Sequence, residues 1–176
     1  MDVMVDLETL STRPHALILV IGAVKFNRKG KMLDLKKMDT FYRRITISSC
    51  VEKGMHTDEG TREWWNEQDP KIKEEAFGEP RTDLFTALCQ FIEWFGEAKW
   101  IWSHGASFDC VILKEAFLRC GLETPWEFWN ERDTRTLFDV AGVRNSDLPQ
   151  TQKHHALYDC HRQIYGVKIS MKKLIG

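Results

Sequence analysis

The sequence predicts an α/β fold in which helices flank one mixed central sheet. Strand-like segments cluster before residue 48, and helical patterns dominate from residue 57 onward. One further strand-like segment, Lys99–Ser103, lies between two helical patterns. Consecutive strands with short turns pair antiparallel, whereas strands that alternate with helices pair parallel. We therefore expect an antiparallel meander first and parallel strands after it.

The strands of the meander follow from apolar and β-branched runs. Met1–Asp6 alternates valine with methionine, and Ala16–Phe26 is apolar and rich in β-branched residues. The polar segment Glu8–His15 separates these two strands, and Asn27–Gly30 is a turn toward the next strand. Thr40–Ile47 contains aromatic residues and isoleucines, which predicts the third strand.

The helices are predicted from apolar residues at helical spacing and from capping residues at their ends. Pro70 is expected to end the first helix, and Gly121 the third. The expected helices are Thr57–Gln68, Arg81–Phe95, Phe108–Cys120, Asp133–Val140 and His155–Leu174.

The 176 residues read as one domain, 1–176, because they contain no internal repeat and no Pro/Gly-rich linker. The longest apolar run, Ala16–Val24, is well below the ~18 residues that span a bilayer, and Asp2 and Asp6 argue against a leader peptide. Five scattered cysteines form no Cys-x-x-Cys motif, which argues against a disulfide framework and a cysteine zinc site. We expect a cytoplasmic protein without membrane contact.

The formal net charge of −1 excludes a protein that binds polyanions through a global basic surplus. Any contact with nucleic acid must therefore be local or assisted by metal ions. A dinucleotide-binding or P-loop enzyme is also excluded, because the sequence contains neither G-x-G-x-x-G nor a P-loop motif.

Three separated segments carry carboxylates that together favour a metal site. Asp6 and Glu8 lie two residues apart at the end of an apolar strand, so both side chains point to the same face. An isolated pair of this kind is usually a solvated strand end. Asp109 opens one helix, and the last helix begins near His154 and Asp159. Four carboxylates and a histidine from distant segments favour a hard cation over zinc-thiolate chemistry.

These motifs resemble the DnaQ-like DEDDh exonucleases of the ribonuclease-H-like superfamily. The matching motifs are Asp6-x-Glu8, Phe108-Asp109 and His154-x-Ala156-x-x-Asp159. The tyrosine branch of this group has Tyr four residues before the last Asp, where this chain has His155, so the histidine branch fits better. One departure is Gly105, where many relatives carry Asn.

The resemblance extends over nearly the whole chain, to phage and prophage 3′–5′ exonucleases and stand-alone exoribonuclease-like domains. The stretches that carry it are Asp6–Leu10, Ile21–Val24, Thr61–Trp65, Trp102–Leu113 and Trp126–Thr136. If a phage encodes the chain, the expected compartment is the host cytoplasm. Some members of the superfamily are dimers, so the resemblance admits a homodimer.

The resemblance implies a ribonuclease-H-like fold and a 3′–5′ exonuclease that releases nucleoside 5′-monophosphates from 3′ ends of single-stranded DNA or RNA. Two ions, Mg²⁺ or Mn²⁺, would lie about 3.5–4 Å apart and serve the attacking and leaving oxygens. Asp6, Glu8 and Asp159 would hold one ion, and Asp6 with Asp109 the other. His154 would accept the proton of the attacking water.

Helix spacing leaves His155 open as an alternative base. If the last helix includes residue 155, His155 lies one turn before Asp159 and shares its face, whereas His154 points elsewhere. A loop before the helix would remove this conflict. The family pattern favours His154, which we choose.

The resemblance also implies contacts with the terminal nucleotide from Thr9 and from Leu10, an apolar wedge. A helix points the adjacent Trp64 and Trp65 in different directions, so we expect one in the core and the other stacked on a base. Trp65 is our candidate for the stacking ring, with Phe108 as a second.

Two other classes of function stay open. A non-catalytic nucleic-acid-binding or assembly module would retain the fold without the chemistry, and a docked domain would serve a larger replication or repair assembly. The presence of all five catalytic residue types argues against the first class. The absence of an obvious docking tail argues against the second.

Overall fold

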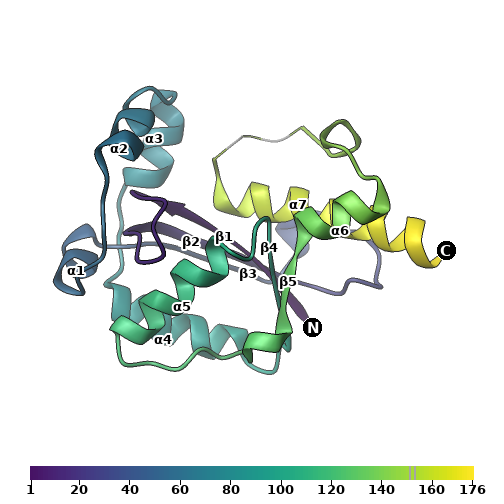
Figure 1. Cartoon of the computed structure of the whole chain (residues 1–176), viewed down its shortest axis with the longest axis horizontal. Coiled ribbons are helices and arrows are strands. Elements are labelled where there is room, and N and C mark those ends of the chain that lie inside the picture. Colours follow the sequence, from purple (N-terminus) through teal and green to yellow (C-terminus); the bar gives the residue numbers. More distant parts are fainter. Residues whose placement is uncertain (151, 153) are drawn as a thin grey trace.

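The computed structural model describes residues 1–150, 152 and 154–176, and these residues form one five-stranded sheet with the order β3-β2-β1-β4-β5. Strands β1, β2 and β3 pair antiparallel, whereas β4 and β5 extend the sheet in parallel from β1 (Figure 1). The strands are β1 (Asp2–Thr9), β2 (Ile18–Phe26), β3 (Thr40–Arg44), β4 (Trp100–Ser103) and β5 (Glu131–Asp133). The predicted α/β class is confirmed, and the mixed order is consistent with a ribonuclease-H-like fold.

Helices flank this sheet, as expected (Figure 1). The α-helices are α1 (Ile47–Glu52), α2 (Glu59–Asn66), α3 (Pro70–Phe77), α4 (Leu84–Phe95), α5 (Asp109–Arg119), α6 (Thr134–Ala141) and α7 (Ala156–Ile175). Short 3-10 helices are η1 (Leu35–Lys37), η2 (Phe128–Asn130) and η3 (Asn145–Asp147). Among the helices of the described residues, none has both the length and the apolar character that a bilayer span requires.

Two apolar layers, one on each face of the sheet, decide which way the β1 side chains point. Val3 and Val5 belong to the cluster that packs against α4 and α5. Met4 faces the opposite cluster, which includes Phe138 of α6 and Ile164 of α7. Because side chains alternate along a strand, Asp6 and Glu8 share the face of Met4. The period of β1 therefore directs both carboxylates toward α7.

A glycine lets α7 lie directly on β2. A Cβ atom at Gly22 would overlap the Cβ of Ala156, the first residue of α7, and would lie 3.2 Å from the backbone nitrogen of Leu157. Gly22 pairs with Asp6 in the β1–β2 register. The first turn of α7 therefore lies beside Asp6.

Several predicted boundaries were wrong for identifiable reasons. Pro70 begins α3 instead of only ending the helix before it, because Asp69 caps the new helix and proline is favoured in a first turn. The predicted third strand ends at Arg44, and its last expected residue, Ile47, opens α1. Strand β1 continues through Glu8 to Thr9, into the segment expected to be a break.

Candidate active site

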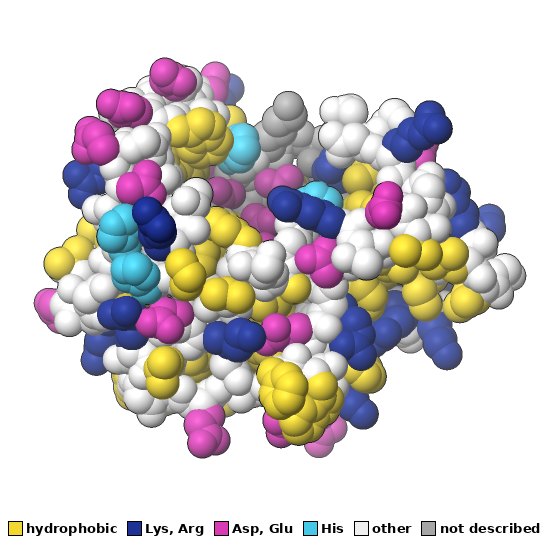
Figure 2. Space-filling model, viewed as in Figure 1, with side chains coloured by type: hydrophobic (Ala, Val, Ile, Leu, Met, Phe, Trp, Pro, Cys, Tyr) yellow, Lys and Arg dark blue, Asp and Glu magenta, His cyan; other side chains and the backbone are white. Residues whose placement is uncertain are grey.

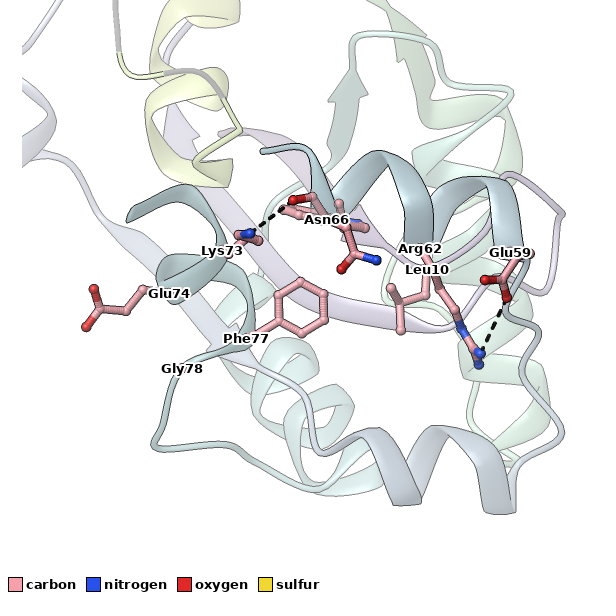
Figure 3. A pocket seen from close by; sticks show the side chains of 9 residues that line it. Leu10, Glu59, Arg62, Asn66, Lys73, Glu74, Phe77 and Gly78 are labelled. Atoms are coloured by element: carbon pink, nitrogen blue, oxygen red, sulfur yellow. Dashed lines mark hydrogen bonds and ion pairs between the residues drawn. The ribbon is translucent and has the colours of Figure 1, made fainter. Parts of the chain in front are cut away.

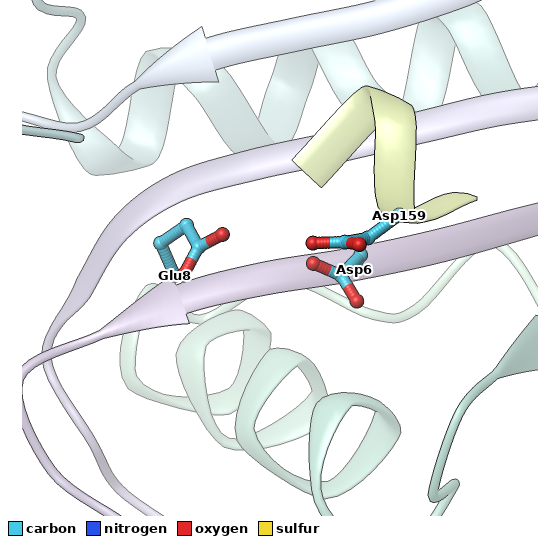
Figure 4. A group of neighbouring side chains, drawn as sticks. All are labelled: Asp6, Glu8 and Asp159. Atoms are coloured by element: carbon cyan, nitrogen blue, oxygen red, sulfur yellow. The ribbon is translucent and has the colours of Figure 1, made fainter. Parts of the chain in front are cut away.

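Two carboxylates of β1 and one of α7 converge at the carboxyl end of β1. Asp6 and Glu8 lie near the end of the strand, and Asp159 comes from the first turn of α7 (Figure 4). One oxygen of each carboxylate lies within 4.8 Å of one oxygen of each other carboxylate. Strand spacing predicted that Asp6 and Glu8 share a face, and the family resemblance implied that Asp159 joins them. A set of carboxylate oxygens matches the preference of hard divalent cations.

Asp109 joins the same site from the opposite side of β1. It is the first residue of α5 and is 4% exposed. Its Oδ1 accepts a hydrogen bond of 3.2 Å from the backbone N–H of Leu7, the residue between Asp6 and Glu8. This bond holds Asp109 against the strand that carries the other two carboxylates.

Burial raises the pKa values of all four carboxylates, and repulsion from neighbouring carboxylates adds to this at Asp6 and Glu8. Burial is the largest cause of the raised pKa of Asp6, followed by the charges of Asp109, Glu8 and Asp159. Burial, then Asp159 and Asp109, raises the pKa of Glu8 to about 8. Burial raises the pKa of Asp109 to about 7 and also raises that of Asp159. A cation at this place would offset the repulsion and favour the charged forms.

The two histidines occupy different environments. His154 lies before α7 with a φ of 56°, and its ring lines the cavity above the carboxylates while standing 4.9 Å from the ring of Trp64. His155 is the N-cap residue of α7, and its Nε2 lies 3.6 Å from Glu75. Its ring stacks on Tyr42, away from the lining of that cavity. The helix thus begins after both histidines, which removes the spacing objection to His154.

The carboxylates open into a cavity of about 400 Å³. Sequence reasoning missed Gln163, whose Nε2 donates a hydrogen bond of 3.0 Å to Asp6, because no motif marks a glutamine one turn beyond Asp159. Two cations, Arg135 and Arg162, also line this cavity. In the space-filling view, acidic side chains lie in the central hollow, with basic side chains beside them (Figure 2).

The backbone conformation at position 105 favours glycine, and the guanidinium of Arg135 lies beside it. Gly105 has a φ of 115°, a conformation that side-chain-bearing residues rarely adopt. A Cβ there would lie 3.4 Å from the guanidinium carbon of Arg135. Where many relatives of the resembled group carry Asn, this chain therefore has Gly105 with the guanidinium of Arg135 beside it.

A second cavity, of about 440 Å³, continues from Glu8 along α2. Thr9, Trp64 and Phe108 line it, and Trp64 is 39% exposed. Trp65 is 3% exposed, and its indole N–H donates a hydrogen bond of 2.8 Å to the carbonyl oxygen of Thr9. Trp65 is therefore the core member of the pair, and Trp64 is the more exposed ring on this cavity. The stacking of a base on either ring stays a prediction.

Leu10 faces a separate apolar cavity between α2 and α3, of about 630 Å³ (Figure 3). Phe77 lines this cavity together with Leu10, and Trp65 lines both this cavity and the one beside Glu8. Leu10 thus lines a different cavity from the one beside Glu8. Its expected contact with the terminal nucleotide stays a prediction.

Comparison with known proteins points to one class of enzyme. A family model described as the 3′-5′ exoribonuclease Rv2179c-like domain matches residues 1–171. The exodeoxyribonuclease of Enterobacteria phage T4 is 21% identical over 211 residues, covering 99% of this chain and 91% of that protein. These matches confirm the exonuclease resemblance that the motifs indicated.

The raised carboxyl pKa values predict that the metal-free protein loses stability as the pH rises. Between the ordinary carboxyl values of 3.8 and 4.5 and the raised values of about 7 and about 8, the folded protein binds more protons than the unfolded chain. Raising the pH through this window therefore lowers the free energy of unfolding. We expect the Tm in EDTA to fall from about pH 5 to about pH 8, and Mg²⁺ or Mn²⁺ to restore it most at the higher pH, in scanning fluorimetry.

Glu8→Gln should weaken both the pH dependence and the response to metal, because it removes one buried charge. Glu52→Gln, a change of an exposed carboxylate in α1, is the matched control and should behave like the unaltered protein. A Tm at about pH 8 that responds to neither ion would contradict the site.

Proposed function

The chain belongs to the family of 3′-5′ exoribonuclease Rv2179c-like domains, and on that premise we propose that it is a metal-dependent 3′–5′ exonuclease of the DEDDh type. Its substrate is single-stranded nucleic acid. The observation that carries the proposal is the convergence of Asp6, Glu8 and Asp159 within 4.8 Å beside a cavity that His154 lines. The names of the family and of the T4 relative differ in the sugar, so the proposal covers both RNA and DNA.

The donor set fits two divalent ions. Asp6, Glu8 and Asp159 would hold one ion, and Asp6 with Asp109 the other. All donors are carboxylate oxygens, which suits Mg²⁺ or Mn²⁺, and their raised pKa values favour a compensating cation. Such ions, when bound, would lower the pKa of a bound water and stabilise the leaving oxygen.

His154 is the proposed base. Its place in the turn before α7, with the ring on the cavity wall, allows it to accept a proton from a water above the carboxylates. The contact with Trp64 restricts the ring on one side. Gln163 holds Asp6 by its hydrogen bond and so fixes the orientation of that carboxylate.

The surroundings suit a nucleotide end. Arg135 and Arg162 line the carboxylate cavity and offer positive charge to the scissile phosphate. The adjoining cavity offers Trp64 and Phe108 as stacking surfaces and Thr9 as a polar contact for the terminal nucleoside. Attack on the phosphate that joins this nucleoside to the chain releases a nucleoside 5′-monophosphate.

The test is degradation of end-labelled oligonucleotides, DNA and RNA, single- and double-stranded, with Mg²⁺, Mn²⁺ or EDTA. We expect stepwise release of 5′-monophosphates from the 3′ end of single strands, and no release in EDTA. Nicking of a circular single strand would indicate an endonuclease. Binding without degradation under every condition would indicate a non-catalytic module. Light scattering on the same sample measures whether the protein is a homodimer.

His154→Ala should lower kcat by about 10²–10⁴-fold, because it removes proton transfer from the attacking water. Its metal affinity, measured by titration calorimetry, should stay near that of the unaltered protein, since the four carboxylates remain. His155→Ala is the matched control. This substitution removes the contacts with Glu75 and Tyr42. It should therefore lower the Tm and leave kcat close to that of the unaltered protein. If His155→Ala abolishes turnover while His154→Ala retains it, His155 is the base.

A further inference from the structure

One face of α7 carries a stripe of aromatic and basic side chains. Tyr158, Arg162, Tyr165, Lys168 and Lys172 follow one another at spacings of three or four residues, which places them on the same side of the helix. Both tyrosines expose more than a third of their surface, at 39% and 37%. Every residue of α7 is described, and Asp159 is its sole acidic residue.

The stripe starts at the carboxylate cavity. Arg162 lines that cavity together with Asp159. Its guanidinium donates hydrogen bonds to the carbonyl oxygen of Pro149 at 3.1 Å and to Oδ1 of Asn145 at 2.7 Å. These bonds fix a positive charge at the near end of the stripe.

The stripe ends at a basic cavity of about 520 Å³ between the β2–β3 connection and the last turns of α7. Arg28, Lys29, Lys168 and Lys172 line it. Its described lining contains no Asp or Glu, although Arg28 forms an ion pair with Asp2 outside the lining. The ammonium of Lys168 donates hydrogen bonds to carbonyl oxygens of the connection at 2.6 Å and 2.7 Å, which holds its basic residues beside α7. Basic side chains gather on the side of the molecule toward the C-terminal end of α7 (Figures 1 and 2).

We propose that this stripe and the basic cavity bind the sugar-phosphate backbone of the single strand, on the 5′ side of the nucleotide being removed. The inference rests on the proposed function and extends it to a second contact with the substrate. Lys and Arg side chains neutralise phosphates, and exposed tyrosine rings stack on bases of any sequence. The local surplus of cations on α7 supplies the attraction that the nearly neutral chain as a whole does not.

Helix geometry sets the length of strand that is needed. Lys168 and Lys172 lie nine and thirteen residues beyond Asp159, which at a rise of ~1.5 Å per residue is about 14–20 Å. A stacked strand advances ~3.4 Å per nucleotide, so about four to six nucleotides reach the cavity. Affinity should therefore depend on length, increasing once an oligonucleotide exceeds this size.

The experiment compares Lys29→Ala/Lys172→Ala with the unaltered protein. Both lysines are exposed and lie outside the proposed catalytic site. We expect about tenfold weaker binding of a labelled oligonucleotide of about fifteen nucleotides, by fluorescence anisotropy in EDTA. The dependence of log K on log salt should flatten by about 1.4, from two lost phosphate contacts on a single strand. Lys53→Ala/Lys71→Ala is the matched control and should change neither value, because these exposed lysines lie at the C-cap of α1 and in α3.

A kinetic test with Mg²⁺ separates this contact from the chemistry. The double variant should raise KM for the long oligonucleotide but not for one of about three nucleotides, with kcat unchanged for both. Tyr165→Ala should act in the same direction and Tyr165→Phe should not, since stacking needs the ring.

These experiments distinguish failure of the proposed nuclease function from failure of the proposed binding surface. If the unaltered protein binds the long strand through these lysines but degrades nothing, the proposed function fails and the binding surface stands. If it degrades single strands while the double variant shows unaltered binding and KM, the surface is overturned and the nuclease stands. An equal rise in KM for both lengths would also overturn the surface.

Discussion

The close approach of α7 to β2 at Gly22 is the constraint on which the site depends. Gly22 faces Ala156 without a side chain between them, and it pairs with Asp6 across the sheet. The thiol of Cys160 adds contacts of 3.6 Å to the carbonyl oxygens of Met4 and Gly22 on the same two strands. The first turn of α7 is thus fixed over β1, and Asp159 reaches Asp6.

This packing creates an electrostatic cost that a functional site can explain. Asp6, Glu8, Asp109 and Asp159 are brought together with pKa values raised chiefly by burial. Burial disfavours the charged forms of these carboxylates, so without a cation the arrangement opposes stability at neutral pH. Buried groups that lower stability in this way are expected at sites that bind a ligand.

Local pattern was enough to predict the α/β class and the face of β1 that carries Asp6 and Glu8, because strand period and burial agree there. It was not enough for Pro70, because a proline can end one helix or begin the next. The N-cap residue Asp69, whose side chain accepts a hydrogen bond from the backbone of Lys71, shows that Pro70 begins α3. Nor did it separate Trp64 from Trp65, whose burial depends on the tertiary hydrogen bond to Thr9. Gln163 lies outside every motif, because its role exists only after α7 packs on β1.

We infer that packing of α7 on β1 builds a divalent-cation site from carboxylates. The most direct measurement is anomalous diffraction from a crystal equilibrated with Mn²⁺ near pH 8, where the carboxylates favour metal. We expect anomalous density among Asp6, Glu8 and Asp159, with a second peak on the side of Asp109. Absence of density there at saturating Mn²⁺, or density only at other residues, would contradict it.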